Sequence, residues 1–501
     1  MPLPLEEATV AGLQEAMASG RTSARRLVEE YLGRIEAIDR GGPALHAVIE
    51  INPEALEIAD RLDAERRSKG PRGPLHGIPV LLKDNIDTAD RMATSAGSLA
   101  LARSIAKEDA FLVKRLREAG AVILGKTNLS EWANFRSTRS SSGWSARGGQ
   151  TRNPYVLDRN PCGSSSGTGA AIAANLAVVG VGTETDGSIT CPAAMMALVG
   201  IKPTLGLVSR SGIIPISHSQ DTAGPMARTV ADAAILLGVL AGMDPQDEST
   251  RARPAVSIDS RSLVADGLRG ARIGVARKGF IGKSPAADEV VEQAIRDLAR
   301  LGAVVVDPAD IPNAGKYDDD ELVVLEYEFK ADLNRYLGRL GPEAPVHSLA
   351  DLIAFNEQNA PAELPFFGQE IFISAQKRGT LADERYKKAH RRILRLAREE
   401  GIDAALRKHR LDALVTLTSN PAWPTDLVNG DHFVVASTTA PAVAGYPHIT
   451  VPAGFVQGLP VGISFIGPKY SEAMLIRFAY AYEQGTRRRA PPGFLRTVEV
   501  P

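Results

Sequence analysis

Two segments of this chain repeat one pattern, in which a glycine closes an amphipathic helix and a short β-branched run follows. In the first segment, residues 111–119 (FLVKRLREA) precede Gly120 and the run AVIL. In the second, residues 289–301 precede Gly302 and the run AVVV. Glycine commonly ends helices, and short apolar runs of this kind are typical of buried strands. The pattern therefore predicts an α/β layered fold around a mixed or parallel buried sheet.

Other segments fit the same two patterns. Short apolar runs predict strands at 78–82, 178–181, 413–417 and 449–451. Longer segments with apolar residues three and four positions apart predict helices at 24–39, 60–69, 170–176, 231–240, 322–337, 385–400 and 471–486. Residues 315–388 are rich in charges and aromatics, unlike the glycine-rich first half, so we expect a helical insertion or cap beside the sheet.

Charge and hydropathy exclude several function classes. The 501 residues include 58 Lys and Arg against 59 Asp and Glu, a net charge of −1, so the basic excess typical of nucleic-acid binders is missing. The sequence has no run of about 20 apolar residues, so we expect no membrane span. The start MPLPLEEATV lacks the features of a signal peptide, which predicts a cytoplasmic protein, or a periplasmic one if a leader has been removed.

Cysteine and histidine offer little basis for metal or redox chemistry. Cys162 and Cys191 are too few for a disulfide framework or a cysteine zinc site, and we expect two buried free thiols. The eight histidines are scattered, with no HExxH motif, and the chain has no phosphate-binding or dinucleotide-binding glycine loop. We therefore expect no metal and no cofactor.

Two glycine-serine segments could surround a negative charge. Residues 161–169 (PCGSSSGTG) precede an alanine-rich helix, whose N-terminal N–H groups would face the loop. Residues 182–192 (GTETDGSITCP) place Ser188 after Gly187, where successive backbone N–H groups could form a nest for an anion. Each segment, taken alone, is equally compatible with an ordinary helix-capping or strand-ending turn.

A third segment, residues 77–87 (GIPVLLKDNID), ends an apolar run with Lys83. Buried lysines are rare, and burial lowers the pKa of the amine, so that it can act as a base. The alternative is a lysine whose amine reaches solvent at the end of the strand.

Together, this lysine, the Gly-Ser-Ser-Ser-Gly loop and a Gly-Ser-Ile turn 24 positions further on resemble the amidase signature family. Its members hydrolyse amides with a Ser-cisSer-Lys triad. The resemblance implies that Lys83 is the base, Ser164 the bridging serine with a cis peptide bond, and Ser188 the nucleophile. It further implies an oxyanion hole at Thr185, Asp186, Gly187 and Ser188, and substrate contacts at Asn134 and Gly163.

Within the family, the segments 128–135, 142–155, 182–189 and 215–227 look closest to bacterial peptide amidases. Asp186 stands where the wider family commonly has glycine, and it fits this subgroup. The resemblance implies one α/β domain over 1–501, with a central mixed β-sheet covered by helices on both faces, a signature core at about 70–230 and a helical insertion or cap at about 315–388.

The implied activity is the release of ammonia from C-terminal peptide amides by a monomer or homodimer that needs no cofactor and binds no nucleic acid or membrane. Amidases of this family that act on aliphatic, aryl or fatty amides, and amidotransferase subunits, are the alternatives.

A rival interpretation comes from the same serine loop. Residues 163–167 also match GxSxG, which would make Ser165 the nucleophile of an α/β-hydrolase with His432 or His448 as its histidine. That motif needs an apolar strand directly before it, whereas residues 153–162 (NPYVLDRNPC) are polar and contain prolines.

Overall fold

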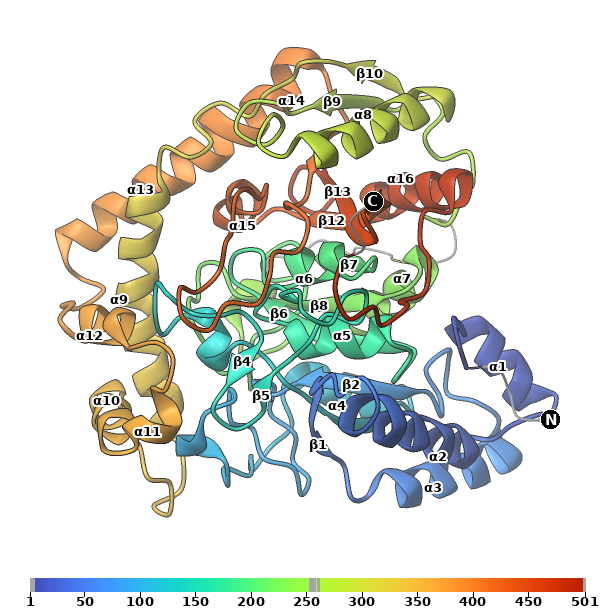
Figure 1. Ribbon diagram of the computed structural model, residues 1–501, viewed down its shortest axis with the longest axis vertical. Coiled ribbons are helices and arrows are strands. Elements are labelled where there is room, and N and C mark those ends of the chain that lie inside the picture. Colours follow the sequence, from blue (N-terminus) through green and yellow to red (C-terminus); the bar gives the residue numbers. More distant parts are fainter. Residues whose placement is uncertain (1–4, 252–257, 259–261, 499–501) are drawn as a thin grey trace.

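One eleven-stranded mixed sheet organises the molecule, running from β1 near the bottom of Figure 1 to β10 at the top. The computed structural model describes residues 5–251, 258 and 262–498. In spatial order the strands are β1 (Val48–Ile51), β3 (Val122–Thr127), β2 (Pro79–Lys83), β6 (Val179–Glu184), β8 (Thr222–Ala227), β7 (Val199–Lys202), β12 (His448–Val456), β13 (Leu459–Ile466), β11 (Ala413–Leu417), β9 (Arg272–Val275) and β10 (Val304–Val306).

The sheet combines parallel and antiparallel pairs. Strand β2 runs parallel to both β3 and β6, and β9 runs parallel to both β10 and β11. The strands between these two groups pair antiparallel, including the hairpin of β12 and β13. A separate two-stranded sheet pairs β4 (Trp144–Ser145) with β5 (Gly149–Gln150). The predicted α/β fold with a large mixed sheet is confirmed.

Helices flank this sheet (Figure 1). They are α1 (Val10–Ala18), α2 (Ala24–Arg34), α3 (Ala55–Lys69), α4 (Phe111–Glu118), α5 (Ser166–Ala173), α6 (Thr190–Met195), α7 (Val230–Leu240), α8 (Pro285–Arg300), α14 (Asp403–His409), α15 (Thr439–Ala444) and α16 (Glu472–Thr486). Short 3₁₀ segments cover Leu99–Leu101, Glu131–Asn134 and Glu248–Thr250, and π-helical segments cover Ile35–Arg40 and Arg398–Ile402. Among the described helices, none is long and apolar enough to cross a bilayer.

The repeated helix-glycine-strand pattern is present in both predicted places. Helix α4 leads through Gly120 into β3, and α8 leads through Gly302 into β10. Both glycines have positive φ, 77° and 96°, a conformation that side-chain-bearing residues rarely adopt. The other predicted helices and strands each overlap an element of the structure, whereas five strands of the large sheet, β1, β7, β8, β9 and β13, were not predicted.

The charge-rich segment forms a group of helices to one side of the sheet, at the left of Figure 1. They are α9 (Asp318–Leu337), α10 (Leu349–Gln358), α11 (Ala360–Glu363), α12 (Glu370–Gln376) and α13 (Glu384–Ala397). Buried side chains such as Phe329 and Phe372 form a second apolar cluster with Trp132 and Ile214. That these helices serve as a cap stays a prediction.

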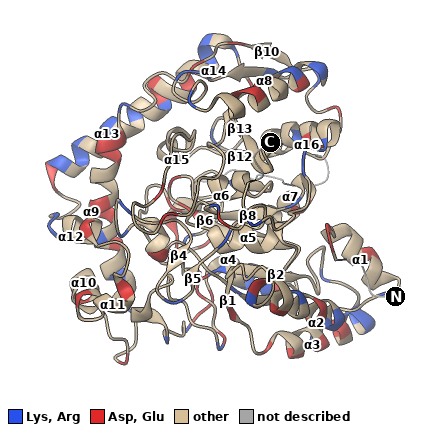
Figure 2. Cartoon of the chain, viewed as in Figure 1, with Lys and Arg blue, Asp and Glu red and all other residues tan. Residues whose placement is uncertain are grey.

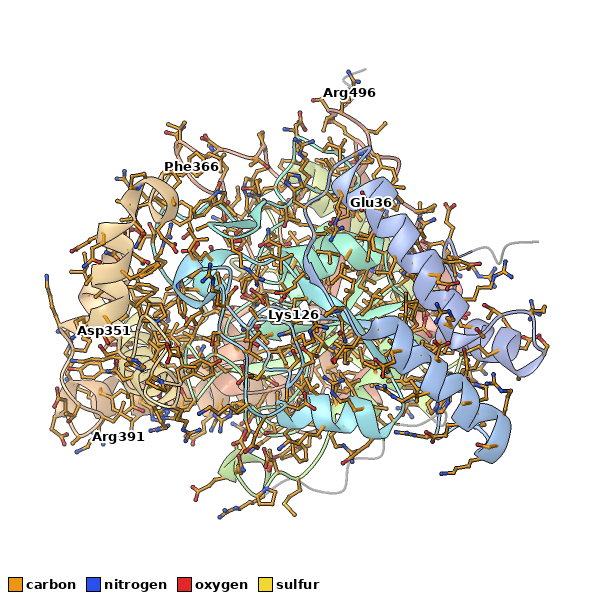
Figure 3. The ribbon with its side chains drawn as sticks, turned by 90° about the horizontal axis from the view of Figure 1, so that it is seen from below. Glu36, Lys126, Asp351, Phe366, Arg391 and Arg496 are labelled. Atoms are coloured by element: carbon orange, nitrogen blue, oxygen red, sulfur yellow. A yellow bond between two sulfur atoms is a disulfide. The ribbon has the colours of Figure 1, made fainter. Side chains whose placement is uncertain are left out.

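Acidic and basic residues both occur along the outer helices, as the colours of α2, α3 and α13 show in Figure 2. In Figure 3, Arg391 and Arg496 lie at the periphery, whereas Lys126, which has no exposed surface, is labelled near the centre. Among the described residues, Lys126 is one of three lysines with no exposed surface, together with Lys83 and Lys202. Since burying a charge is costly, each of these lysines needs a specific explanation.

Candidate active site

The three motifs meet at the carboxyl ends of two neighbouring strands of the sheet. Strands β2 and β6 are parallel neighbours, with Leu82 opposite Val181, so their carboxyl ends lie side by side. Lys83 ends β2, and the turn with Ser188 follows β6. The serine loop enters α5 and touches that turn, because the Ser165 N–H donates to the Ser188 carbonyl at 3.1 Å. The fold therefore brings Lys83 and Ser188, which are 105 positions apart in the sequence, to the same site.

The Lys83 amine is enclosed by hydroxyl and carbonyl oxygens. Its Nζ lies 2.7 Å from Ser164 Oγ, 2.9 Å from Thr183 Oγ1 and 3.3 Å from the Thr183 carbonyl oxygen. A protonated amine can donate to all three oxygens, whereas a neutral amine donates to two and presents its lone pair to the third. In the neutral form, the lone pair can therefore accept the proton of the Ser164 hydroxyl.

Burial adjusts Lys83 toward that neutral form. The side chain has no exposed surface, and desolvation lowers its pKa to about 7, although the charges of Asp221 and Glu184 act in the opposite direction. Near neutral pH, a large fraction of the amine is therefore unprotonated. The alternative in which this lysine reaches solvent is wrong.

Ser164 follows a cis peptide bond from Gly163, and its side chain is fully buried. Gly163 leaves no room for a larger residue, since a Cβ there would lie 2.1 Å from Ser130 Oγ. The Ser130 N–H donates to the Ser164 carbonyl at 3.1 Å. The backbone around Ser164 is thus held from both sides, which directs its hydroxyl to Lys83.

Ser188 lies in a tight turn, and its surface is 6% exposed. The preceding Gly187 has a φ of 78°, and a Cβ there would lie 3.0 Å from Thr438 Oγ1. Within the described part of the chain, the Ser188 hydroxyl has no hydrogen-bond partner, so it is free to approach a substrate.

The backbone N–H groups of this turn divide into two sets. Those of Ile189 and Thr190 donate to the Glu184 carboxylate, at 2.7 and 2.9 Å. The four preceding N–H groups donate to no acceptor among residues 5–251, 258 and 262–498; they belong to Thr185, Asp186, Gly187 and Ser188. Unpaired N–H groups beside a serine hydroxyl are the arrangement that stabilises an oxyanion.

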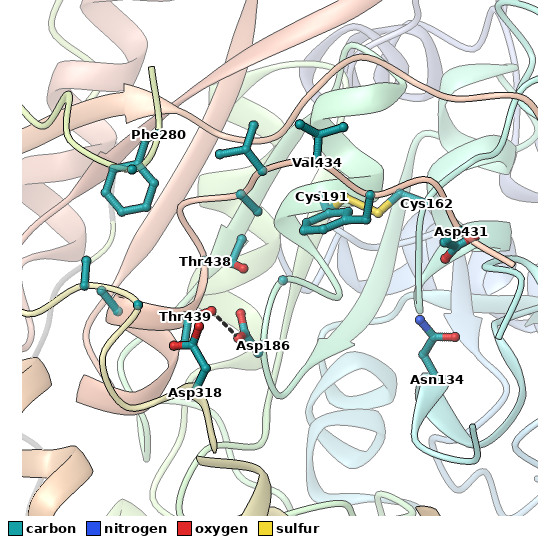
Figure 4. A pocket seen from close by; sticks show the side chains of 18 of the residues that line it. Asn134, Cys162, Asp186, Cys191, Phe280, Asp318, Asp431, Val434, Thr438 and Thr439 are labelled. Carbon is teal, nitrogen blue, oxygen red and sulfur yellow. Dashed lines mark hydrogen bonds between the residues drawn. A yellow bond between two sulfur atoms is a disulfide. The ribbon is translucent and has the colours of Figure 1, made fainter. Parts of the chain in front are cut away.

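A cleft of about 540 Å³ opens beside this turn (Figure 4). Asn134 and Gly163, the two predicted substrate contacts, both line it, together with Asp186 and Gly187. Asn134 Nδ2 donates to Ser142 Oγ at 3.3 Å, and its Oδ1 has no partner in the described structure. No cluster of metal-ligating side chains occurs among the residues that the structure describes.

The prediction of free thiols is wrong, because Cys162 and Cys191 form a disulfide. The bond joins the serine loop to α6, directly behind the turn, and both cysteines line the cleft. Twenty-nine positions separate the two residues, and the fold brings their Cα atoms to 6.1 Å from each other. The cysteine count alone could not reveal this pairing.

The rival motif does not assemble. The Ser165 hydroxyl donates to the Thr183 carbonyl at 3.1 Å and accepts from the Thr183 N–H at 3.2 Å. His432 pairs with Asp426, and His448 lies 2.5 Å from Ser464 Oγ. Neither histidine is hydrogen-bonded to Ser165.

Sequence reasoning missed two residues beside the lysine. Thr183 lies within the segment 182–192 but was not assigned a role, although it supplies two of the three oxygens around Lys83. Asp221, whose charge raises the pKa of Lys83, is 9% exposed and accepts from the Thr185 hydroxyl at 2.6 Å. The only indication of Asp221 in the sequence was its position directly before β8.

Comparison with known proteins identifies the family. The model of the family described as "Amidase" matches residues 26–476. This chain belongs to the amidase signature family. A probable amidase of Arabidopsis thaliana is 45% identical over 98% of the chain and 92% of its own length. A solved peptide amidase of Stenotrophomonas maltophilia is 55% identical, with a TM-score of 0.94, and the match covers 98% of this amidase and all of that chain.

The family also contains glutamyl-tRNA(Gln) amidotransferase subunits. Such a subunit from Pseudomonas syringae pv. syringae is 36% identical over 98% of this amidase and 100% of its own length. The comparisons support an enzyme that hydrolyses amides, and this amidase is structurally close to peptide amidase.

Proposed function

We propose that this amidase hydrolyses the C-terminal amides of peptides with Ser188 as nucleophile, Ser164 as proton bridge and Lys83 as base. The observation that carries the proposal is the 2.7 Å contact between the buried Lys83 amine and the Ser164 hydroxyl. The 55% identity to a peptide amidase over nearly the whole chain supports the substrate class.

In the first half of the reaction, neutral Lys83 accepts the proton of Ser164, which accepts the proton of Ser188. The Ser188 oxygen attacks the amide carbonyl. The N–H groups of residues 185–188 stabilise the oxyanion, and one such donor is worth about 3 to 4 kcal/mol. The proton returns through Ser164 to the leaving nitrogen, and ammonia departs from an acyl-enzyme ester.

In the second half, water attacks the ester and Ser188 is released. The same relay removes the proton of the water and returns a proton to Ser188. Every proton transfer thus passes through Lys83 and Ser164, so no metal is required for the nucleophile to be activated.

Ammonia release from C-terminally amidated dipeptides, measured beside aliphatic and aryl amides, tests this proposal. We expect the peptide amides to react fastest, and Ser188→Ala to lose about 10⁴-fold or more, because the nucleophile is removed. Ser165→Ala should lose far less, and it serves as the neighbouring control. Turnover confined to non-peptide amides would refute the substrate class and leave the triad intact.

A second candidate function is membership of an amidotransferase complex, which the 36% identity to the Pseudomonas syringae amidotransferase chain favours. Turnover of small amides by the isolated chain, without ATP or a partner protein, would exclude dependence on such a complex. Activity that appears only with a partner would favour it.

A further inference from the structure

Acidic residues line the cleft on two sides. In Figure 4, Asp431 and Asn134 lie on one side, Asp186 and Asp318 lie on the other, and the disulfide lies between them. Acidic side chains in a cleft either hold the protein together or bind a ligand. Their hydrogen-bond partners distinguish these two roles.

Asp431 is occupied by the protein itself. Its carboxylate accepts from the Ser142 N–H at 3.0 Å, the Ser142 hydroxyl at 2.5 Å, Asn160 Nδ2 at 3.0 Å and Trp423 Nε1 at 3.3 Å. These donors satisfy both oxygens and tie the segment around residue 431 to the loop around residue 142. Asp431 therefore has a structural role.

The carboxyl groups on the opposite side lack a counter-charge. Asp186 Oδ2 accepts from the Thr439 hydroxyl at 2.7 Å, while Oδ1 is buried without a partner. Asp318 is exposed in the first turn of α9, whereas Glu321 in the same turn is 6% exposed and accepts from Gln220 Nε2 at 2.7 Å. Across the described residues, none of these three carboxyls forms an ion pair.

A buried lysine whose pKa responds to Asp186 is directed elsewhere. Lys202 is fully buried, and the charge of Asp186 acts on its pKa, but Lys202 Nζ donates to the Pro203 carbonyl at 3.1 Å. Burial raises the pKa of Asp186 to about 6, and burial together with the charge of Asp186 raises the pKa of Glu321 well above its usual range. Buried carboxyl groups without a cation are unfavourable, so a positively charged ligand would stabilise this end of the cleft.

A buried hydroxyl provides an independent indication of a ligand. Tyr317 lines the cleft and is 1% exposed, and its hydroxyl has no hydrogen-bond partner in the described part of the chain. Burial raises the pKa of this hydroxyl, and the charges of Glu321, Asp186 and Asp318 act in the same direction. The hydroxyls of Tyr31 and Tyr482 also lack a partner, but of these three tyrosines only Tyr317 lines the cleft, where a ligand can supply one.

We propose that the end of the cleft formed by Asp186, Tyr317 and Asp318 binds an ammonium group of the substrate, so that the amidase prefers peptide amides that carry a positive charge. This inference rests on the proposed function. An ammonium group has three N–H donors and one positive charge, which match the carboxylates and the hydroxyl of this site. The ammonium can belong to a lysine side chain or to the free N-terminus of a short peptide.

Three dipeptide amides separate these sources. Acetylglycyl-norleucinamide has no cation, acetylglycyl-lysinamide has a side-chain ammonium, and glycyl-norleucinamide has an N-terminal ammonium. We expect kcat/KM at pH 7.5 to be about tenfold higher for at least one cationic amide than for the neutral one, the range of a charge-assisted hydrogen bond. Whichever cationic amide reacts faster identifies the source.

The variant Asp318→Asn should reduce this preference several-fold. Asp319→Asn is the matched control, because Asp319 lies in the same turn of α9 but does not line the cleft, and it should keep the preference. Equal kcat/KM for all three amides, or a preference that survives Asp318→Asn unchanged, would overturn the ammonium site.

A binding measurement separates this inference from the proposed function. If the enzyme hydrolyses none of the three amides, the proposed peptide-amide activity fails, and calorimetry of the same compounds with Ser188→Ala decides the ammonium site. Tighter binding of a cationic amide, weakened by Asp318→Asn, would support the site. Equal binding of all three compounds, or no binding of any, would overturn it.

Discussion

Two buried lysines on neighbouring strands have different surroundings. Strands β2 and β3 are parallel, with Leu82 opposite Lys126 and Lys83 opposite Thr127, so both lysines lie near the carboxyl ends of their strands and their side chains leave opposite faces of the sheet. Both side chains have no exposed surface, and burial lowers the pKa of both amines. Burial alone therefore does not distinguish a base from a structural cation.

The partners of the two amines provide the distinction. Lys126 Nζ donates to the Ile86 carbonyl at 2.6 Å and to the Thr94 hydroxyl at 3.0 Å. Four carboxyl groups favour its charged form, those of Asp84, Asp87, Asp90 and Glu50. Only two carboxyl groups, those of Asp221 and Glu184, act on Lys83 in this way, and its amine contacts a serine hydroxyl. We infer that Lys126 stabilises the fold and that Lys83 transfers protons.

The largest effect should come from removing the Lys83 amine. Lys83→Met keeps an unbranched side chain without a base, and we expect kcat/KM to fall by about 10²- to 10⁴-fold, the usual contribution of general-base catalysis. Ammonia release at pH 8 measures this. Activity within about tenfold of the wild type would contradict the role of Lys83 as base.

Lys126→Met is the matched variant on the neighbouring strand. It leaves the buried Ile86 carbonyl and Thr94 hydroxyl without the amine, so we expect the free energy of unfolding to fall by about 1 to 3 kcal/mol. Urea denaturation measures this fall. The activity of the remaining folded enzyme should change much less than in Lys83→Met. If Lys126→Met instead lost activity at unchanged stability, the assignment of a structural role to Lys126 would be wrong.

The disulfide supports the Lys83 site but not the Lys126 site. The double variant Cys162→Ser, Cys191→Ser removes a cross-link between residues 29 positions apart, which should lower the free energy of unfolding by roughly 3 to 4 kcal/mol. Activity should also fall, since the bond joins the segments that carry Ser164 and Ser188. Calorimetry and alkylation of the unfolded wild type without reductant are the measurements. Labelling of two free thiols would show that the bond is absent.

The smallest effect is a pH dependence. Since burial lowers the pKa of Lys83 to about 7, the amine is neutral above that pH and protonated below it. Because the neutral amine is the base, kcat/KM should be constant at high pH and roughly tenfold lower one unit below the pKa. Asp221→Asn removes a charge that favours protonation, so its profile should move to lower pH. A profile that declines toward high pH between 6 and 8 would contradict this assignment.

Local patterns in the sequence were sufficient for much of the fold. The pattern around Gly120 and Gly302 was predicted because helix endings and apolar runs depend on neighbouring residues. Strand β8 was missed because its sequence, TAGPMA, contains glycine and proline, which are uncommon in strands. Its pairing with β6 on one side and β7 on the other makes it a strand, and no local pattern shows that pairing.

The candidate site divides in the same way. The resemblance to the amidase signature family, which rests on the spacing of Ser164 and Ser188 and on Lys83 at the end of an apolar run, was sufficient to nominate the three residues. Lys126 ends a similar run and is equally buried, yet nothing in the sequence assigned the two lysines different surroundings. The surroundings come from residues far along the chain, such as Thr183 and Asp221.

The sequence by itself determined the order of helices and strands and the chemical groups available to the site. The tertiary structure alone decided which of these groups meet: the amine of Lys83 with Ser164, Cys162 with Cys191, and the carboxyls of Asp186 and Asp318 without a cation. The physical reason is range. Backbone preferences act over a few residues, whereas desolvation, hydrogen bonds and charge act between any groups that packing brings within a few ångströms.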